Sequence, residues 1–235
     1  MSKFSNDNSV HENEHNTEDE IISENSNEKY ETFENWEDSN LNLKLDLLRG
    51  IYSYGFSQPS PIQQKSIISV IKGHDIIAQA QSGTGKTGAF SIGALQLVDP
   101  SINDTQILLL SPTRELAKQS YNVITNISNK MNIRTELLIG GTTVNKDSGN
   151  MRLPHIIVGC SGRVFDMIKR KHISYKTIKL MILDEADEML SIGFKEQVYE
   201  IFQYMNANIQ IALFSATMPP EIETLTSKFM RNPIK

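Results

Sequence analysis

Between residues 75 and 230, short runs of consecutive apolar residues alternate with longer amphipathic segments. Consecutive apolar residues are typical of strands that are covered on both faces, whereas half-exposed strands alternate apolar with polar residues. The runs are 75–79, 106–111, 134–139, 155–159, 180–184 and 210–215, and the helix-length segments lie near 86–98, 113–130, 162–171, 192–205 and 219–230. This order predicts an α/β fold, a mostly parallel sheet with helices on both faces, and ligands at the carboxyl ends of the strands.

Two further helices are predicted before the first strand. Leucines and isoleucines recur from Leu41 to Ile51, and Pro61 can open a second helix that runs to Ile71. Both would precede the sheet in the chain.

The first 31 residues differ from the rest in charge and in apolar content. They hold nine acidic and two basic residues, a net charge of −7, whereas the other 204 residues hold 21 basic and 19 acidic residues, a net charge of +2. Because large apolar side chains are scarce here, we predict a disordered acidic tail over 1–31 and one folded domain over 32–235. The tail either keeps the chain soluble or competes with phosphates for basic groups.

The cysteine count and the hydropathy pattern limit the location of the protein. Cys160 is the single cysteine, so no internal disulfide can form. No run approaches the roughly 18 apolar residues of a membrane helix, and the amino terminus has no apolar signal core. We expect a reducing compartment, the cytoplasm first with the nucleus as the alternative, and no membrane partner.

A phosphate-binding loop follows the first predicted strand. The segment 80–87 reads Ala-Gln-Ser-Gly-Thr-Gly-Lys-Thr and leads into a predicted helix, with Ala80 where the common pattern has glycine. Its glycines permit a tight turn whose N–H groups cradle phosphates, Lys86 can reach the β- and γ-phosphates, and the Thr87 hydroxyl can bind Mg²⁺. The residues expected to bind the nucleotide here are Ser82, Gly83, Thr84, Gly85, Lys86 and Thr87.

A second acidic element ends another apolar strand. Asp184 and Glu185 follow the run at 180–183, where a phosphate-loop enzyme holds its metal ion. We predict Asp184 as the Mg²⁺ ligand and Glu185 as the group that orients or deprotonates the attacking water; the alternative is an acidic helix start, which the helix dipole favours. The segment 129–132, Asn-Lys-Met-Asn, has Asn where a carboxylate would read guanine, so GTP is disfavoured.

An ordered set of motifs resembles the DEAD-box RNA helicases over residues 33–235. The set is Gly-Phe at 55–56, Pro-Ser-Pro-Ile-Gln at 59–63, the phosphate loop, Pro-Thr-Arg-Glu-Leu-Ala at 112–117, Gly-Gly at 140–141, Asp-Glu-Ala-Asp at 184–187 and Ser-Ala-Thr at 215–217. Longer strings, such as 47–56 and 162–167, are most similar to the translation initiation factor 4A subgroup. The resemblance implies a RecA-like domain that hydrolyses ATP with Mg²⁺ and unwinds RNA.

The resemblance also implies an adenine site. Gln63 would read the base edge through its amide, which can donate and accept together, and Phe56 belongs to the same motif. An upstream aromatic ring would stack on adenine, with Trp36 favoured over Phe33 on spacing. The alternative for either ring is a core position that tethers the leading helix.

Sequence-independent contacts with the RNA sugar-phosphate backbone are implied at three segments. The expected residues are Pro112, Thr113, Arg114, Glu115, Gly140, Gly141, Ser161, Gly162 and Arg163. Each arginine could instead form a structural ion pair. Where the family pattern has Thr-Pro-Gly-Arg, this chain has Cys160 and Ser161 before the Gly-Arg, so we expect Ser161 to replace the missing hydroxyl and Cys160 to be packed.

Three residues are expected to connect the two binding sites. Ser215 and Thr217 follow the last strand, close in the expected fold to Asp187, and their hydroxyls could bond its carboxylate. The coupling hypothesis is that this contact transmits the state of the metal site to the RNA.

The family implies a second RecA-like domain after Lys235, which carries an arginine finger and half of the RNA groove. Nothing in residues 1–235 matches it. We therefore expect an amino-terminal helicase half, monomeric, that binds ATP and RNA and hydrolyses little ATP by itself, with a translation-initiation scaffold as a further partner. The alternative is a stand-alone half-helicase, a nucleotide-switched module without productive catalysis.

Overall fold

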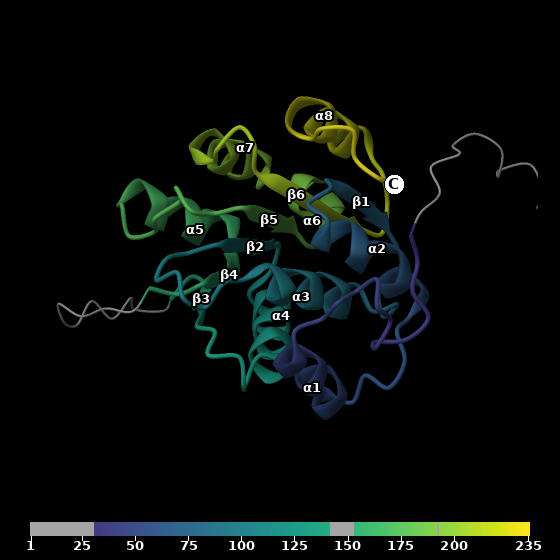
Figure 1. Ribbon diagram of the computed structural model, residues 1–235. Helices are drawn as coiled ribbons and strands as arrows, with labels where there is room; N and C mark the ends of the chain where they lie inside the picture. The colour runs from purple at the N-terminus through teal and green to yellow at the C-terminus, as the bar shows by residue number, and fades with distance from the viewer. Residues whose placement is uncertain (1–30, 142–152, 192) are drawn as a thin grey trace, which may run out of the picture. The chain divides into compact units, whose positions relative to one another are not determined.

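The computed structural model describes residues 31–141, 153–191 and 193–235, and the described part folds into eight helices and six strands (Figure 1). The strands are β1 (Ile76–Gln79), β2 (Ile107–Ser111), β3 (Thr135–Leu138), β4 (Ile156–Cys160), β5 (Leu180–Leu183) and β6 (Gln210–Ser215). The helices are α1 (Leu45–Tyr54), α2 (Pro61–Ile71), α3 (Lys86–Leu97), α4 (Arg114–Ile127), α5 (Ser161–Lys169), α6 (Ala186–Ser191), α7 (Lys195–Tyr204) and α8 (Pro220–Phe229). The predicted acidic tail, apart from Glu31, lies outside the described residues.

All six strands form one sheet in the order β1-β6-β5-β2-β4-β3. Every pairing between them is parallel. The prediction of a RecA-like α/β fold with a parallel sheet is thereby confirmed. Because the strands are parallel, the loops that follow them all lie at the carboxyl edge of the sheet.

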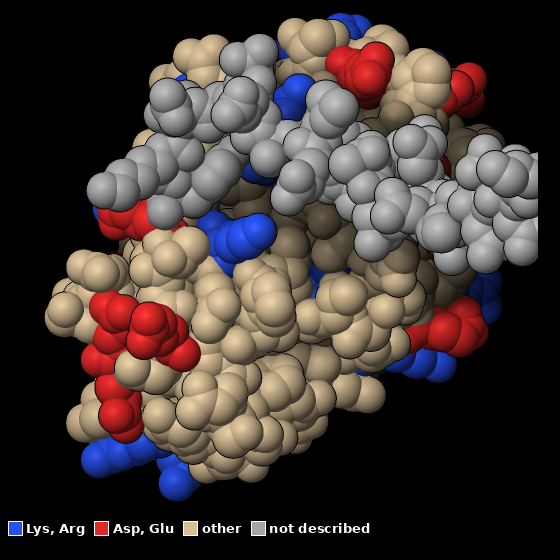
Figure 2. Space-filling view, turned by 90° about the vertical axis from the view of Figure 1, so that its right-hand side faces the viewer, with Lys and Arg blue, Asp and Glu red and all other residues tan. Residues whose placement is uncertain are grey.

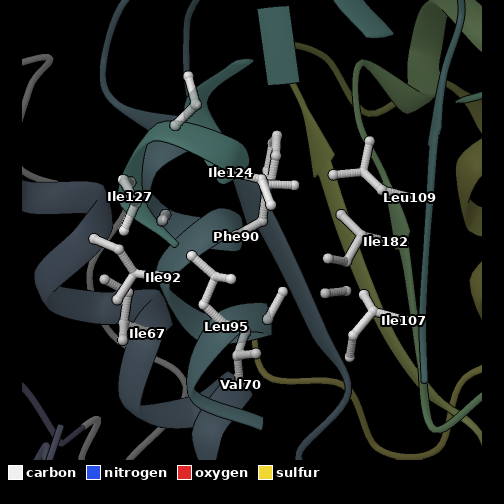
Figure 3. Packing of buried hydrophobic residues seen from close by; sticks show 14 of the residues in the cluster. Ile67, Val70, Phe90, Ile92, Leu95, Ile107, Leu109, Ile124, Ile127 and Ile182 are labelled. Carbon is white, nitrogen blue, oxygen red and sulfur yellow. The ribbon is translucent and has the colours of Figure 1, made fainter. Parts of the chain in front are cut away.

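Helices cover both faces of the sheet, which explains why the strands are apolar without alternation. Ile107 and Leu109 of β2 belong to the core beneath α1 to α4, and Leu108 and Leu110 belong to the core beneath α5 to α8 (Figure 1). Figure 3 shows the first of these cores, where side chains of α2, α3 and α4 meet those of β2 and β5.

The two predicted leading helices are α1 and α2. The first begins only at Leu45, because Asn42 in the preceding loop has a φ angle of +43°, which does not fit a right-handed helix; Leu41 is buried in that loop. Gly50 of α1 allows a close approach to α4, since a Cβ atom there would lie 1.9 Å from the Ile127 carbonyl oxygen. The sequence pattern missed α6, whose six residues are too short for a helical period to be seen.

The end of the chain runs beside the edge strand β1. Ile234 forms a parallel bridge with Ile76, and its carbonyl oxygen accepts a hydrogen bond from Ile77 N at 2.7 Å. This bridge covers the backbone groups of an otherwise open edge. Of the helices in the described ranges, none has both the length and the apolar content to cross a bilayer.

Candidate functional site

The carboxyl edge of the sheet gathers the segments that the sequence analysis selected. The phosphate loop follows β1, Pro112 follows β2, Gly140 follows β3, Ser161 follows β4, Asp184 follows β5 and Thr217 follows β6. Parallel pairing brings together segments that are far apart in the chain, and this edge is where open α/β sheets bind ligands.

The phosphate loop has the backbone geometry of an anion site. Gly83 and Gly85 have φ angles of +82° and +104°, which side-chain-bearing residues rarely adopt. Ser82, Gly83 and Thr84 are exposed, and α3 begins directly after the loop at Lys86. Free N–H groups of the first turn and the positive end of the helix dipole therefore face the loop.

Lys86 joins the loop to the end of β5. Its side chain is 5% exposed, and its Nζ donates to the Ala80 carbonyl oxygen at 2.9 Å and to the Glu185 carboxylate at 3.0 Å. The lysine and the carboxylate are 99 residues apart in sequence. The structure thus brings two of the three predicted catalytic residues into direct contact.

Asp184, the third predicted catalytic residue, is 4% exposed and directly precedes Glu185. Burial, followed by the negative charge of Glu185, raises the pKa of Asp184 to about 7, although the charge of Lys86 opposes the shift. Glu185 itself has a φ angle of +47°, an uncommon backbone conformation for a residue with a side chain. Backbone strain of this kind is found where neighbouring structure holds a functional group in place.

Sequence reasoning missed Ser120, which hydrogen-bonds to Asp184 from α4. Ser120 is 1% exposed and lies on the sheet-facing side of α4 between Ala117 and Ile124, both fully buried. The signal was present in the sequence, because a hydroxyl in an otherwise apolar helical stripe needs a buried partner.

Thr87 and Asp184 supply the oxygen donors that Mg²⁺ prefers. Thr87 lies in the first turn of α3, beside the loop, and Asp184 ends β5. The described residues contain no group of three or more His, Cys, Asp or Glu side chains that could hold a metal ion alone. The donor set therefore fits an ion that is bound partly by the protein and partly by phosphate and water, as Mg²⁺ is.

Gln63 and Phe56 both lie against the helix that follows the phosphate loop. A Cβ atom on Gly88 would approach the Gln63 Nε2 to 2.5 Å and the Phe56 Cε2 to 3.0 Å. Gln63 is 3% exposed; its Oε1 accepts from Ser60 N at 2.8 Å and its Nε2 donates to the Gly85 carbonyl oxygen at 3.2 Å. In this conformation the amide holds the loop, and its role towards adenine stays a prediction.

Both upstream aromatic rings have core contacts in this conformation, and stacking of Trp36 on adenine stays a prediction. Trp36 is 1% exposed, packs on Phe33 with ring centroids 5.7 Å apart, and donates from Nε1 to the Phe56 carbonyl oxygen at 3.0 Å. Phe33 is 2% exposed. Neither ring has a free face for a base, and both have the core role that the sequence left open.

Two of the predicted RNA-binding segments meet in the structure. The Arg114 guanidinium lies against the glycine pair, where a Cβ atom on Gly140 would lie 2.9 Å from its NH2 and one on Gly141 would lie 4.0 Å from its NH1. Arg114 is exposed. Thr113 caps α4 by accepting from Leu116 N at 3.2 Å.

The remaining members of the predicted RNA set differ in accessibility. Pro112 is buried, whereas Glu115 and Gly162 are exposed. RNA binding by these positions is not tested by the geometry, and it stays a prediction.

The hydroxyl of Ser161 has a partner within the protein in this conformation, and its expected role towards RNA stays a prediction. Ser161 is 2% exposed and donates towards the Gln197 Oε1 at 3.4 Å, so the hydroxyl points into the protein. Arg163 lies 3.5 Å from Asp166, which is the ion pair that the sequence left as the alternative. Burial raises the pKa of the Cys160 thiol, and Cys160 packs against the core.

The three predicted coupling residues are in contact. Asp187 Oδ2 accepts from Thr217 Oγ1 at 2.7 Å and from Thr217 N at 3.0 Å, and Asp187 N donates to Ser215 Oγ at 3.2 Å. Burial raises the pKa of Asp187, but the hydrogen bonds from Thr217 and Ser215 together hold it below its ordinary value. The end of β6 is thus tied to the first turn of α6.

Comparison with known proteins gives consistent matches. The sequence profile described as DEAD/DEAH box helicase matches residues 60–225. The chain is 52% identical over 206 residues to a protein named ATP-dependent RNA helicase eIF4A from Chaetomium globosum, covering 87% of this chain and 51% of that protein. The chain thus spans about half the length of this curated relative.

Two solved structures have the same fold. A DEAD box protein from Methanococcus jannaschii superposes with a TM-score of 0.80 and 37% identity, covering 86% of this chain and 55% of that one. Dbp5 of S. cerevisiae, bound to RNA and ADP BeF3, superposes with a TM-score of 0.75 and 33% identity, covering 83% and 50%.

Proposed function

Because this chain belongs to the DEAD/DEAH box helicase family, we propose that it is the ATP-binding half of an ATP-dependent RNA helicase. The observation that carries the proposal is the contact between Lys86 and Glu185, 3.0 Å apart beside the phosphate loop and next to Asp184. The rest of the enzyme is a second RecA-like domain, which completes the ATP site and the RNA groove.

ATP binds with its phosphates on the N–H groups of the loop at 83–85 and on the first turn of α3. Lys86 then exchanges its contact with Glu185 for the β- and γ-phosphates. The released Glu185 carboxylate orients a water molecule towards the γ-phosphate and accepts its proton. Phe56 and Gln63 bind the adenine, and the Gln63 amide exchanges its contact with Gly85 for the base.

Mg²⁺, when it is bound with ATP, neutralises the charge that develops on the phosphates. Thr87 and Asp184 are the residues that hold it. Ser120 orients the Asp184 carboxylate through the hydrogen bond described above.

RNA binds at the same edge of the sheet through its backbone. Arg114 is exposed beside Gly140 and Gly141, so a phosphate can approach both the guanidinium and the main chain. Thr113, Glu115, Gly162 and Arg163 complete this surface. The bonds of Asp187 with Ser215 and Thr217 tie the end of β6 to the start of α6 beside Asp184, and this contact is proposed to couple ATP hydrolysis to strand separation. A scaffold protein of the translation-initiation kind is a further proposed partner.

The test is a titration of ATP·Mg²⁺ and an assay of ATP hydrolysis with and without single-stranded RNA. Glu185→Gln is the main variant, and the exposed Glu196→Gln on α7 is the matched control. We expect the chain to bind ATP and to hydrolyse it slowly without RNA stimulation. Glu185→Gln should keep ATP binding and lower hydrolysis by about 10²-fold or more, the usual contribution of a general base.

Two outcomes contradict the proposal. If the chain fails to bind ATP·Mg²⁺, it is not an ATP-binding half. If Glu185→Gln hydrolyses ATP as the control does, Glu185 does not activate the water. RNA stimulation of the chain alone would instead show that it completes its own site and needs no second domain.

A further inference from the structure

The segment 169–179, called the basic run below, lies outside the site described above. It reads Lys-Arg-Lys-His-Ile-Ser-Tyr-Lys-Thr-Ile-Lys and contains five Lys or Arg residues and no acidic residue. Without these five charges the net charge of residues 32–235 changes from +2 to −3 (16 basic and 19 acidic residues). Five of the 21 basic residues of this range therefore lie within 11 consecutive residues.

The basic run lies at the opposite edge of the sheet from the nucleotide site. It connects the carboxyl end of α5 to the start of β5, and Lys179 directly precedes Leu180. Asp184 follows the other end of the same strand, which places the two edges about 15 Å apart at roughly 3.3 Å per residue. The function proposed above makes no use of these residues.

The lysines of the basic run are exposed and not neutralised within the described residues. Lys169, Lys171, Lys176 and Lys179 are exposed, and no carboxylate in the described part of the chain lies within 4 Å of their ammonium groups. Arg170 pairs with Asp166 at 2.7 Å. The helix dipole explains basic residues in the last turn of α5, but not Lys176 and Lys179, which lie well beyond the helix end.

Two further carboxylates border the basic run. Asp104 accepts a hydrogen bond from Ser174 Oγ at 3.1 Å, and Asp99 acts electrostatically on Lys179 and on Lys44. Lys44 in turn lies close enough to Lys179 for the two positive charges to interact. Lys44 thus partly offsets the two aspartates, and the surface around the basic run stays positive.

The backbone of the basic run is held rigidly. Ile173 and Ile178 are 6% and 2% exposed and anchor the segment in the core. Thr177 Oγ1 donates to the Thr105 carbonyl oxygen at 2.9 Å, and Asn206 Nδ2 donates to the Lys176 carbonyl oxygen at 2.9 Å. A partner that binds here therefore does not have to order the backbone, and only side-chain freedom is lost.

From this geometry we propose that the basic run is a second binding surface for the RNA phosphate backbone. Lysine ammonium groups bind phosphates as point charges without reading sequence. Tyr175 lies between the lysines in the sequence and packs partly buried against the core, with its ring centroid 5.5 Å from that of Tyr204. On the face shown in Figure 2, by contrast, basic and acidic side chains are interspersed. The choice of RNA as the polyanion rests on the proposed function.

The test measures binding of a fluorescent oligouridylate to the full chain without nucleotide, at several salt concentrations. The patch variant is Lys169→Gln/Lys171→Gln/Lys176→Gln. The control is Lys65→Gln/Lys130→Gln/Lys235→Gln, which removes the same charge from three exposed lysines elsewhere. The patch variant should bind about tenfold more weakly at low salt, and the slope of log K against log salt should fall by about 2, or roughly 0.7 for each lost phosphate contact. The control should change the affinity less than twofold.

Equal weakening in the two triple variants would overturn the proposal, because it would show a general effect of net charge. If the patch variant binds polyglutamate more weakly than the unmodified chain does but binds RNA equally well, the proposal is also overturned, and the surface is assigned to an acidic protein. ATP·Mg²⁺ binding should be unchanged in the patch variant. If the unmodified chain binds RNA at this surface but does not bind ATP, the proposed function fails while the surface proposal stands.

Discussion

Two aspartates with the same exposure lie at opposite edges of the sheet. Asp75 directly precedes β1 and Asp184 directly follows β5, and each is 4% exposed. Asp75 accepts from Ile211 N at 2.8 Å through one oxygen and from Arg231 N at 2.7 Å through the other. Asp184 faces side chains instead, with Ser120, Lys86 and Glu185 around it.

The difference in partners separates a structural group from a functional one. A buried carboxylate whose two oxygens accept backbone N–H groups ties strands together and leaves little capacity for a ligand. Other buried polar side chains at the amino edge also bond to backbone groups, as Asp75 does. Gln210 donates to two carbonyl oxygens, and His155 accepts from Arg134 N. At the carboxyl edge, buried charges contact one another and can exchange partners.

The largest expected effect is on stability at the amino edge. Asp75→Ala leaves two backbone N–H groups without their acceptor, at about 1–3 kcal/mol each, so the free energy of unfolding should fall by about 3 kcal/mol. Asp184→Ala should lower it by about half as much or less, because the side chains around Asp184 can exchange partners and only one backbone N–H group, that of Glu185, loses its acceptor. Urea unfolding of both variants measures this. Equal losses would remove the distinction between the two edges.

At the carboxyl edge the corresponding effect is on ligand binding. Lys86→Met removes a charged donor to the phosphates, a hydrogen bond of about 1.5–3 kcal/mol, so ATP affinity should fall about 10- to 150-fold. Lys65→Met, an exposed lysine on α2, is the control. Calorimetric titration with ATP·Mg²⁺ gives the affinities. Unchanged affinity in Lys86→Met would mean that the lysine serves only the ion pair with Glu185.

A smaller effect on ATP affinity is expected from Ser120, which contacts Asp184 at the carboxyl edge. Ser120→Ala removes one hydrogen bond to Asp184, typically about 1 kcal/mol, so the gain in ATP affinity on adding Mg²⁺ should shrink about fivefold. Ser91→Ala is the matched control, because Ser91 is fully buried and its hydroxyl has no hydrogen-bond partner. If both variants respond alike, loss of a buried hydroxyl in general, not the bond to Asp184, causes the change.

The smallest effect concerns Asp187, whose pKa is lowered in the folded chain. A carboxylate with a lowered folded pKa stabilises the fold above its unfolded pKa, and this stabilisation is lost as pH falls through the folded value. Thr217→Val removes one of the bonds that lower the pKa. The difference in unfolding free energy between pH 7 and pH 3 should therefore shrink, by less than about 1 kcal/mol. Thr224→Val on α8, which should leave this difference unchanged, is the control.

The sequence alone was sufficient for the order of the strands and of every helix except α6, and for the position of the candidate site. Runs of consecutive apolar residues marked every strand to within about a residue, because burial on both faces leaves no polar positions in a parallel strand. The phosphate loop and Asp184 were found because their chemistry needs particular residue types directly after a strand. The burial of Ser161 and Trp36 could not be predicted, because spacing gives a side chain's place in the chain but not its direction.

What the sequence determined by itself, then, is local: which segments form strands and helices, where the glycines allow a phosphate loop, and where charge collects along the chain, as in 169–179. The tertiary structure decided which groups meet. The contact of Lys86 with Glu185 and the bond of Ser120 to Asp184 join residues that the folded sheet brings together, and the burial of Trp36 joins the loop before α1 to the Phe56 carbonyl oxygen. These contacts depend on side-chain packing between distant segments, which no local pattern of residues encodes.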